Sequence, residues 1–253
     1  MSIWAIADLH LSISTPAKSM EMLSEKWKNY HERIKKNWSN LITDDDLVLI
    51  PGDICWASTL DDALLDLVWI DKLPGKKLLL KGNHDYWWGS LNKVKSALPK
   101  SISVLQNDVY LFKDTAIGGA RLWDTQEYNF NEYIEFQENP YAKDQENDVQ
   151  VDLQEKIFAR ELIRLEMSLS KIPKGAKNKI AMTHYPPISA DLKSSKTAQI
   201  LEKYGIQICI FGHLHSIKND VKMFGEKNNV NYIFAAADYI DFKPLLIIKS
   251  NEE

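Results

Sequence analysis

The segment Ile3-Trp4-Ala5-Ile6-Ala7-Asp8-Leu9-His10 is an apolar run of strand length that ends directly in a carboxylate and an imidazole. Residues two positions apart in an extended chain point to the same side, so we expect Asp8 and His10 to project together from the end of this strand. The loops that follow the strands of an open α/β sheet are where such folds bind their ligands. This stretch therefore predicts both an α/β fold and the place of its functional site.

The same arrangement recurs along the chain. Five of the six histidines fall in short polar clusters, each of which follows an apolar run, and Gly52-Asp53 adds a carboxylate in the same setting. The clusters are Asp8-Leu9-His10, Gly82-Asn83-His84-Asp85, Met182-Thr183-His184-Tyr185-Pro186-Pro187 and Gly212-His213-Leu214-His215. Oxygen and nitrogen donors that emerge together at strand ends predict a metal site.

These clusters offer more donors than one metal ion uses. The candidate ligands are Asp8, His10, Asp53, Asn83, His184, His213 and His215. Seven donors are too many for a tetrahedral zinc ion, whereas two cations that share one carboxylate would each receive four protein ligands. A mixed set of imidazole and carboxylate suits Mn, Fe, Zn, Co or Ni without choosing among them.

The composition sets limits on fold and partners. The 253 residues, 45% of them hydrophobic, can bury a sizeable core, and we expect one domain over 1–253 because the candidate ligands span most of it. A net charge of -4 argues against a surface for long nucleic acid. No apolar run reaches the roughly 20 residues that cross a bilayer, and two cysteines cannot form a disulfide framework. We expect a cytoplasmic protein without a leader peptide or a membrane partner.

Strands and helices alternate along most of the chain, which indicates βαβ units and a largely parallel sheet. Short strands with few helix formers between 101 and 118 predict a sheet edge or the start of a second sheet. We expect helices over residues 20–41, 60–73, 90–98, 153–169 and 196–204. We expect strands over residues 3–7, 46–50, 76–80, 101–105, 108–113, 115–118, 180–182, 206–211, 230–236 and 244–248.

Residues 125–150 interrupt this alternation. The segment is strongly acidic and carries aromatic side chains at Tyr128, Phe130, Tyr133, Phe136 and Tyr141. It is either a solvated surface loop or a lid over the site. Its aromatic residues and the scarcity of long irregular loops without a role favour a lid.

Taken together, the motifs D-x-H, G-D, G-N-H-D, H and G-H-x-H resemble, in this order, those of the calcineurin-like metallophosphoesterase superfamily. The match runs from Asp8 to His215 and is specific only as a joint pattern, because G-D or H-x-H alone would be nearly worthless. The chain also resembles a bacterial group of uncharacterised predicted phosphohydrolases in that superfamily, with Asp-Tyr-Trp-Trp after the Asn-His pair. The resemblance implies a four-layer α/β/β/α sandwich, in which two packed sheets are flanked by helices.

The resemblance also implies roles for single residues. One cation is expected on Asp8, His10, Asp53 and His215, and a second cation on Asp53, Asn83, His184 and His213. Asp53 would then bridge the two ions, and a hydroxide held between them would attack phosphorus in line with the departing oxygen. His84 is expected to contact the phosphate and to donate a proton to the leaving group.

Departures from the superfamily's protein phosphatases narrow the substrate. Those enzymes carry D-x-H-G, G-D-x-x-D-R-G and G-N-H-E, whereas this chain has Trp56 in place of the acidic partner of the catalytic imidazole and Ala57 in place of a phosphate-binding arginine. We therefore disfavour a phosphoprotein substrate. Gly-Asn-His-Asp is typical of the phosphodiesterase, nuclease and nucleotide-hydrolase branches.

Several side chains near the motifs could contact a substrate. Trp56, Trp87, Trp88 and Trp123 are either core residues or an aromatic wall that stacks a base or sugar ring. Arg121 is either a bidentate phosphate ligand or half of a surface salt bridge. Asp85 is expected to cap the turn into the following helix.

These observations predict a binuclear metal-dependent phosphohydrolase, with manganese as the favoured metal, that cleaves a small phosphodiester or a nucleotide-type phosphoester. A non-catalytic scaffold of the same fold, with residues 125–150 as its contact surface, is the alternative from another class. A nuclease is the alternative among enzymes and is disfavoured by the acidic charge balance.

Overall fold

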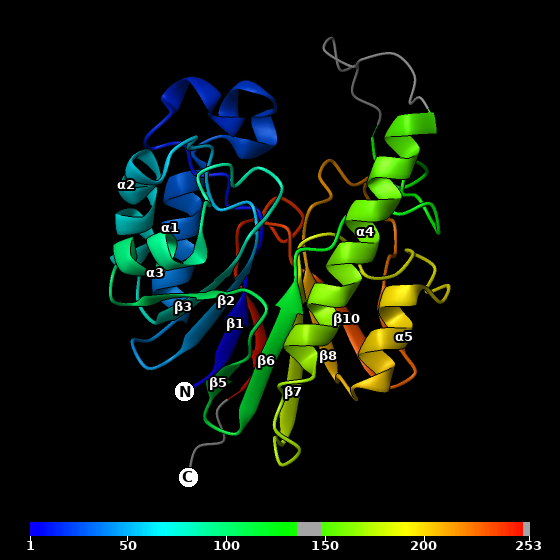
Figure 1. Cartoon of the computed structure of the whole chain (residues 1–253). Coiled ribbons are helices and arrows are strands. Elements are labelled where there is room, and N and C mark those ends of the chain that lie inside the picture. The colour runs from blue at the N-terminus through cyan, green and yellow to red at the C-terminus, as the bar shows by residue number, and fades with distance from the viewer. Residues whose placement is uncertain (136–147, 250–253) are drawn as a thin grey trace.

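Two β-sheets lie against each other in the computed structural model of the chain, which describes residues 1–135 and 148–249 (Figure 1). The first sheet has the strand order β11-β1-β2-β3-β4, and the second has the order β5-β6-β7-β8-β10-β9. Helices cover the outer face of each sheet, so the chain forms four layers. This arrangement confirms the expected α/β/β/α sandwich.

The first sheet is parallel except at one edge. Strands β1 to β4 run parallel, and β11 pairs antiparallel with β1. Their bounds are β1 Ile3–Ala5, β2 Leu47–Pro51, β3 Lys76–Leu80, β4 Ile102–Leu105 and β11 Leu245–Ile248. The parallel order brings the carboxyl ends of β1, β2 and β3 to one side of the sheet, where the polar clusters follow.

The second sheet is parallel in its centre and antiparallel at both edges. Strands β6, β7, β8 and β10 run parallel, whereas β5 and β9 close the edges as antiparallel partners of β6 and β10. The bounds are β5 Tyr110–Phe112, β6 Thr115–Ala120, β7 Asn178–Thr183, β8 Ile208–Phe211, β9 Gly225–Lys227 and β10 Val230–Phe234. The predicted change of pattern between 101 and 118 includes both an edge of the first sheet, β4, and the start of the second sheet at β5.

The helices form the two outer layers. On one side of the sandwich lie α1, α2 and α3, and on the other lie α4 and α5 (Figure 1). Their bounds are α1 Tyr30–Leu41, α2 Leu60–Asp71, α3 Leu91–Ala97, α4 Asp148–Leu169 and α5 Lys196–Lys203. Ser195 caps the N-terminus of α5 through a hydrogen bond that its hydroxyl accepts from the Ala198 amide.

Alternation along the strands explains the layers. In β2, Leu47 and Leu49 point into the cluster between the sheets, whereas Val48 and Ile50 point toward the helices of the first outer layer. In β7, Met182 belongs to the inner cluster and Ala181 packs under α4 and α5. Because both faces of each sheet are covered, the central strands are mostly apolar, and their polar residues lie at the strand ends, such as Lys76 and Lys77 in β3 and Asn178 and Lys179 in β7.

The expected helix over residues 20–41 is wrong in its first half. Two short 3-10 turns, Met20–Met22 and Glu25–Trp27, precede α1, which starts only at Tyr30. Asn29 lies between the second turn and α1 and has a left-handed φ of 53°. This conformation cannot continue a right-handed helix. Of the apolar residues before Asn29, Met20 and Trp27 are buried in the core between the first sheet and its helices, whereas Met22 and Leu23 are exposed.

The segment predicted as an insertion at 125–150 is only partly described. Residues 136–147 lie outside the described ranges, and 148–150 are the beginning of α4 rather than part of a loop. Strand β9 was not predicted, because its three residues, Gly-Glu-Lys, have no apolar pattern. Within 1–135 and 148–249, no helix is sufficiently long and apolar to span a bilayer.

We predict that Leu49→Ala destabilises the fold by about 2–5 kcal/mol, because it leaves a cavity in the cluster between the sheets, where Leu49 is fully buried. Urea unfolding followed by circular dichroism measures the change. Leu65→Ala is the matched control, since Leu65 lies on α2 with 59% exposure and its truncation should cost less than about 0.5 kcal/mol. Equal effects of the two changes would contradict the sandwich described here.

Candidate metal centre

The predicted ligands lie together at the carboxyl ends of the strands. Loops after β1, β2 and β3 carry Asp8, His10, Asp53 and Asn83, and loops after β7 and β8 carry His184, His213 and His215. Both sheets thus contribute to one cluster. Its carboxylates are almost inaccessible, with Asp8 0% and Asp53 1% exposed.

One group within the cluster is formed by Asp8, His10 and His215, whose donor atoms all lie within 4.8 Å of one another. The Nε2 atoms of His10 and His215 are 3.0 Å apart. Asp53 reaches this group, because its Oδ2 lies 3.7 Å from His10 Nε2.

A second group surrounds His184. Its donor atoms and those of Asp8 and Asp53 lie within 4.8 Å of one another. Asn83 Oδ1 is 2.6 Å from His184 Nε2 and 3.1 Å from His213 Nδ1. Asp53 Oδ2 is 3.5 Å from His184 Nε2, so a single carboxylate oxygen lies beside both groups.

The tautomer of His184 shows what this second group can hold. Its Nδ1 lies 3.0 Å from the Pro51 carbonyl, which can only accept, so Nδ1 carries a proton. In a neutral imidazole the Nε2 atom then carries a lone pair, which faces the Asn83 amide oxygen and the Asp53 carboxylate. Acceptors that converge in this way fit a cation, and this donor set of nitrogen and oxygen suits a divalent transition metal.

Burial and neighbouring charges shift the pKa values of the side chains in this cluster. Burial raises the pKa of Asp8 to about 7, against the opposing effect of the His184 and His215 imidazoles. Burial also opposes the charge of His184, but Asp53 raises the pKa of this imidazole to about 9. His10 behaves in the opposite way, since burial lowers its pKa to about 3. His10 is therefore neutral at pH 7 and able to coordinate.

Backbone geometry at the ligands is unusual. Four ligand residues other than glycine have left-handed φ values: Asp8 (56°), His10 (44°), Asp53 (51°) and His213 (77°). Such conformations cost energy and persist where the surrounding structure enforces them, often at functional sites. These backbone conformations set the directions in which the ligand side chains leave their loops.

The residue before Asn83 must be glycine because the loops approach each other closely. A Cβ atom on Gly82 would lie 2.1 Å from Asp53 Oδ1 and 2.2 Å from the Asp53 nitrogen. The glycine of the G-N-H-D motif thus lets the loop after β3 pass against the loop after β2.

Asp85 ties these two loops together. Its fully buried carboxylate accepts hydrogen bonds from the backbone N–H groups of Gly82 (2.7 Å) and Ile54 (2.9 Å) and from the Trp87 indole (3.1 Å). Burial raises its pKa to about 6. The expected role as a cap of α3 is wrong, because α3 begins only at Leu91 and the Asp85 carboxylate instead holds the loops that carry Asp53 and Asn83.

His84 lies beside the metal ligands, and among the described residues its imidazole ring forms no ion pair with a carboxylate. Its backbone N–H donates to Asp53 Oδ1 (2.8 Å), and its ring lies 4.5 Å from the Trp56 ring. The Trp56 indole also stacks on His10, with centroids 4.9 Å apart. Trp56 thus packs against both imidazoles, and burial lowers the pKa of His84.

The other predicted substrate contacts separate into two sets. Trp87 and Trp88 are each 3% exposed in the core between the first sheet and its helices, and Trp88 also borders a cavity that Lys81 and Arg121 line. Trp123 packs against Tyr185 at 5.2 Å, and Arg121 stacks over Trp123 at 4.6 Å. The guanidinium of Arg121 also lies 3.7 Å from Glu161 on α4, so the predicted salt bridge is present and is 18% exposed on the arginine side.

Sequence reasoning missed Asp238. Its Oδ1 accepts a hydrogen bond from His215 Nδ1 at 2.9 Å, which leaves His215 Nε2 directed at the cluster. Metal-binding histidines commonly donate their second ring nitrogen to a carboxylate in this way. The available signal was that Asp238 follows Ala235-Ala236-Ala237 after β10, as Asp8 follows β1.

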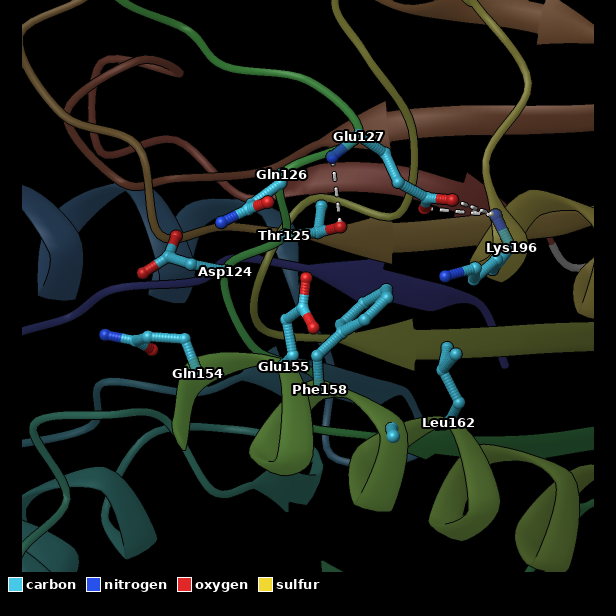
Figure 2. A pocket seen from close by; sticks show the side chains of 10 residues that line it. Asp124, Thr125, Gln126, Glu127, Gln154, Glu155, Phe158, Leu162 and Lys196 are labelled. Carbon is cyan, nitrogen blue, oxygen red and sulfur yellow. Dashed lines mark hydrogen bonds between the residues drawn. The ribbon is translucent and has the colours of Figure 1, made fainter. Parts of the chain in front are cut away.

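Two cavities lie against the segment 124–127. A cavity of about 290 Å³ is bordered by His213 and by the aromatic residues Trp123, Tyr128, Phe130 and Tyr185. A larger one, of about 620 Å³, lies between α4 and the loop 124–127; Figure 2 shows Glu155 and Phe158 of α4 directed toward that loop. Asp124 borders both cavities.

Residues 125–135 are the described part of the predicted segment 125–150 before α4, and they pack beside the loops that carry the candidate histidine ligands. The Tyr128 hydroxyl donates to the Pro186 carbonyl (2.8 Å), and Ile134 forms a β-bridge with Ile217. These contacts place residues 125–135 next to the loops after β7 and β8. The expected lid extends into 136–147, outside the described residues.

Comparison with known proteins agrees with the fold and the motifs. The profile of one protein family, described as calcineurin-like phosphoesterase, matches residues 1–217. The Gene 66 protein of Mycobacterium phage L5 is 34% identical over 84 residues, which are 32% of this chain and 39% of that protein. The chain thus spans about two fifths of the length of this relative.

Two solved structures align with most of the chain. A protein of unknown function, AQ665 from Aquifex aeolicus, shares 16% identity with a TM-score of 0.48, covering 96% of this chain and 94% of its own. The phosphopantetheinyl hydrolase PptH from Mycobacterium tuberculosis shares 14% identity with a TM-score of 0.49, covering 94% of this chain and 91% of its own.

We predict that Asp238→Asn weakens Mn²⁺ binding roughly 10- to 100-fold, as loss of an outer-sphere carboxylate commonly does. The amide cannot stabilise the Nδ1 proton of His215 as a carboxylate does. Equilibrium dialysis with metal analysis measures the affinity. Asp241→Asn is the control, because Asp241 lies three residues further along and its side chain is 85% exposed; an equal loss in both variants would remove Asp238 from the centre.

Proposed function

This chain belongs to the calcineurin-like phosphoesterase family, and on that premise we propose that it is a binuclear metal-dependent phosphohydrolase acting on a small phosphodiester or a nucleotide-type phosphoester. The family makes it a metal-dependent phosphoester hydrolase. The number of metal ions, the roles of single residues and the class of substrate are our proposal.

The observation that carries the proposal is the position of Asp53 Oδ2, which lies 3.7 Å from His10 Nε2 and 3.5 Å from His184 Nε2. One oxygen beside two groups of donors favours a bridging carboxylate. Asp8, His10 and His215 would complete one site, and Asn83, His184 and His213 the other. Divalent cations bound there would lower the pKa of a water molecule and neutralise charge on the phosphoryl oxygens.

His84 is the residue that we assign to the leaving group. Its ring lies at the edge of the cluster, 5.7 Å from the His10 ring, and its Nδ1 is buried without a partner. An imidazole beside the bound phosphate can donate its N–H to the departing oxygen and supply a proton to it. Packing against Trp56 limits the directions in which this ring can point.

The surroundings favour a small substrate with an aromatic or sugar group. The cavity of about 290 Å³ beside His213 is bordered by aromatic side chains, which stack bases without requiring one particular sequence. Trp56 and Ala57 stand where a protein phosphatase carries acidic and phosphate-binding residues. We therefore propose a nucleotide-type ester rather than a phosphoprotein.

The test of this function is hydrolysis of bis-p-nitrophenyl phosphate. We expect protein loaded with Mn²⁺ to contain about two metal equivalents, to lose activity on chelation and to regain it with added Mn²⁺. Asp53→Asn should lose activity by more than the roughly 100-fold that loss of an outer-sphere partner can cost. Full turnover in that variant would refute the bridging role, and metal binding without turnover on a broad panel of phosphoesters would favour the scaffold alternative.

His84→Ala should retain its metal and lose roughly 10²- to 10⁴-fold in kcat, as expected when a proton donor is removed. Metal analysis and steady-state kinetics on the same preparation separate the two effects. His31→Ala is the control, because His31 lies on α1 outside the cluster. Unchanged kcat in the His84 variant would exclude this residue from proton transfer.

A further inference from the structure

A third cavity, separate from the two described above, is lined by positively charged side chains. It has a volume of about 300 Å³ and is lined by the ends of β3, β4 and β6 and by one face of α4. Four of its lining residues are cationic, whereas Glu161 is the only acidic one: the cations are Lys81, Arg121, Arg160 and Arg164. This local excess contrasts with the net charge of -4 of the whole chain.

Structural salt bridges account for only part of this charge. Glu161 is 1% exposed and lies 3.7 Å from Arg121 and 2.6 Å from Arg164, so one carboxylate serves two guanidinium groups. Lys81 donates to the Trp88 carbonyl (2.8 Å), which is neutral. Within residues 1–135 and 148–249, no ion pair joins Lys81 or Arg160 to a carboxylate. The cavity therefore retains uncompensated positive charge that an anion would neutralise.

The cavity lies one strand beyond the metal centre in both sheets. The centre is built on β1, β2 and β3 of the first sheet and on β7 and β8 of the second, and the cavity continues this edge onto β4 and β6. Lys81 of the cavity wall stands two residues before Asn83, so the loop after β3 contributes to both places. Arg121 connects the two places, because its carbonyl accepts the His184 N–H (3.1 Å).

We propose that this cavity binds a second phosphoryl group of the same substrate, so that the hydrolase acts on phosphoesters that carry two phosphoryl groups. The inference rests on the proposed function. Guanidinium groups match phosphate oxygens in bidentate geometry, and Arg121 and Arg160 come from different elements on the cavity wall. One phosphoryl group would lie at the metal centre, and the other would neutralise the cations that Glu161 does not.

The test compares two matched substrates, thymidine 5′-(p-nitrophenyl phosphate) and its 3′-phosphorylated form. In metal-loaded wild-type protein, we expect the 3′-phosphate to raise kcat/KM by roughly 10- to 100-fold, the range of a hydrogen bond to a charged group. Arg160→Gln should abolish most of this preference. Lys156→Gln, which removes an exposed positive charge from α4 outside the cavity, should preserve it. Equal kcat/KM for the two substrates in the wild type would overturn the proposal.

A second measurement is independent of turnover. Metal-loaded crystals soaked in selenate should show anomalous selenium density in the cavity beside Arg121 and Arg160, and this density should be absent in Arg160→Gln. Selenium in the cavity without substrate preference would mean that it binds a free anion, which overturns the substrate assignment. Absence of density in an active enzyme would overturn the anion site itself, whereas loss of all hydrolysis with the density present would refute only the proposed function.

Discussion

The two sheets are joined at the metal centre by Asp8, and the remaining geometry of the site depends on this contact. Both oxygens of its buried carboxylate accept the backbone N–H of His213, at 3.1 and 2.9 Å, so the loop after β1 is fixed to the loop after β8. The approach is so close that a Cβ on Gly212 would lie 2.0 Å from Asp8 Oδ2. Without this approach the histidines of the second sheet would not reach the carboxylates of the first. The centre therefore belongs to the packing of the sandwich rather than to either half.

The packing of the two sheets also brings ionisable side chains together in a buried place. Two carboxylates and several imidazoles are buried together, and burial penalises the charged form of each. Asp8 and His10 consequently have pKa values shifted in opposite directions, to about 7 and about 3. A cation placed among them would satisfy both the carboxylate charge and the imidazole lone pairs. Several buried ionisable groups that a single bound cation would stabilise are characteristic of a functional site rather than of a structural core.

Sequence reasoning predicted the parts of this molecule that depend on local pattern. The apolar runs at β2 and β3 predicted these two strands. The polar side chains after them lie close together because a parallel sheet brings successive carboxyl ends to one edge. Features that depend on three-dimensional neighbours were not predictable. Asp238 follows an apolar run as Asp8 does, but its partner His215 is visible only in the structure. The Trp87 indole is buried on the Asp85 carboxylate, and the break at Asn29 depends on a left-handed residue within an otherwise helical pattern.

Helix α4 separates two electrostatic environments beside the centre. One side of this helix faces the cavity of about 620 Å³ with Glu155, across from Asp124 and Glu127 of the facing loop (Figure 2). Its other side presents Arg160 and Arg164 to the basic cavity. On the proposed function, a substrate with one phosphoryl group at the centre would be attracted by the arginines and repelled by the carboxylates, of which Lys196 offsets only part. Because the two surfaces lie on different faces of one helix, α4 would then set the direction in which an anionic substrate extends from the centre, without contacting the reacting phosphorus.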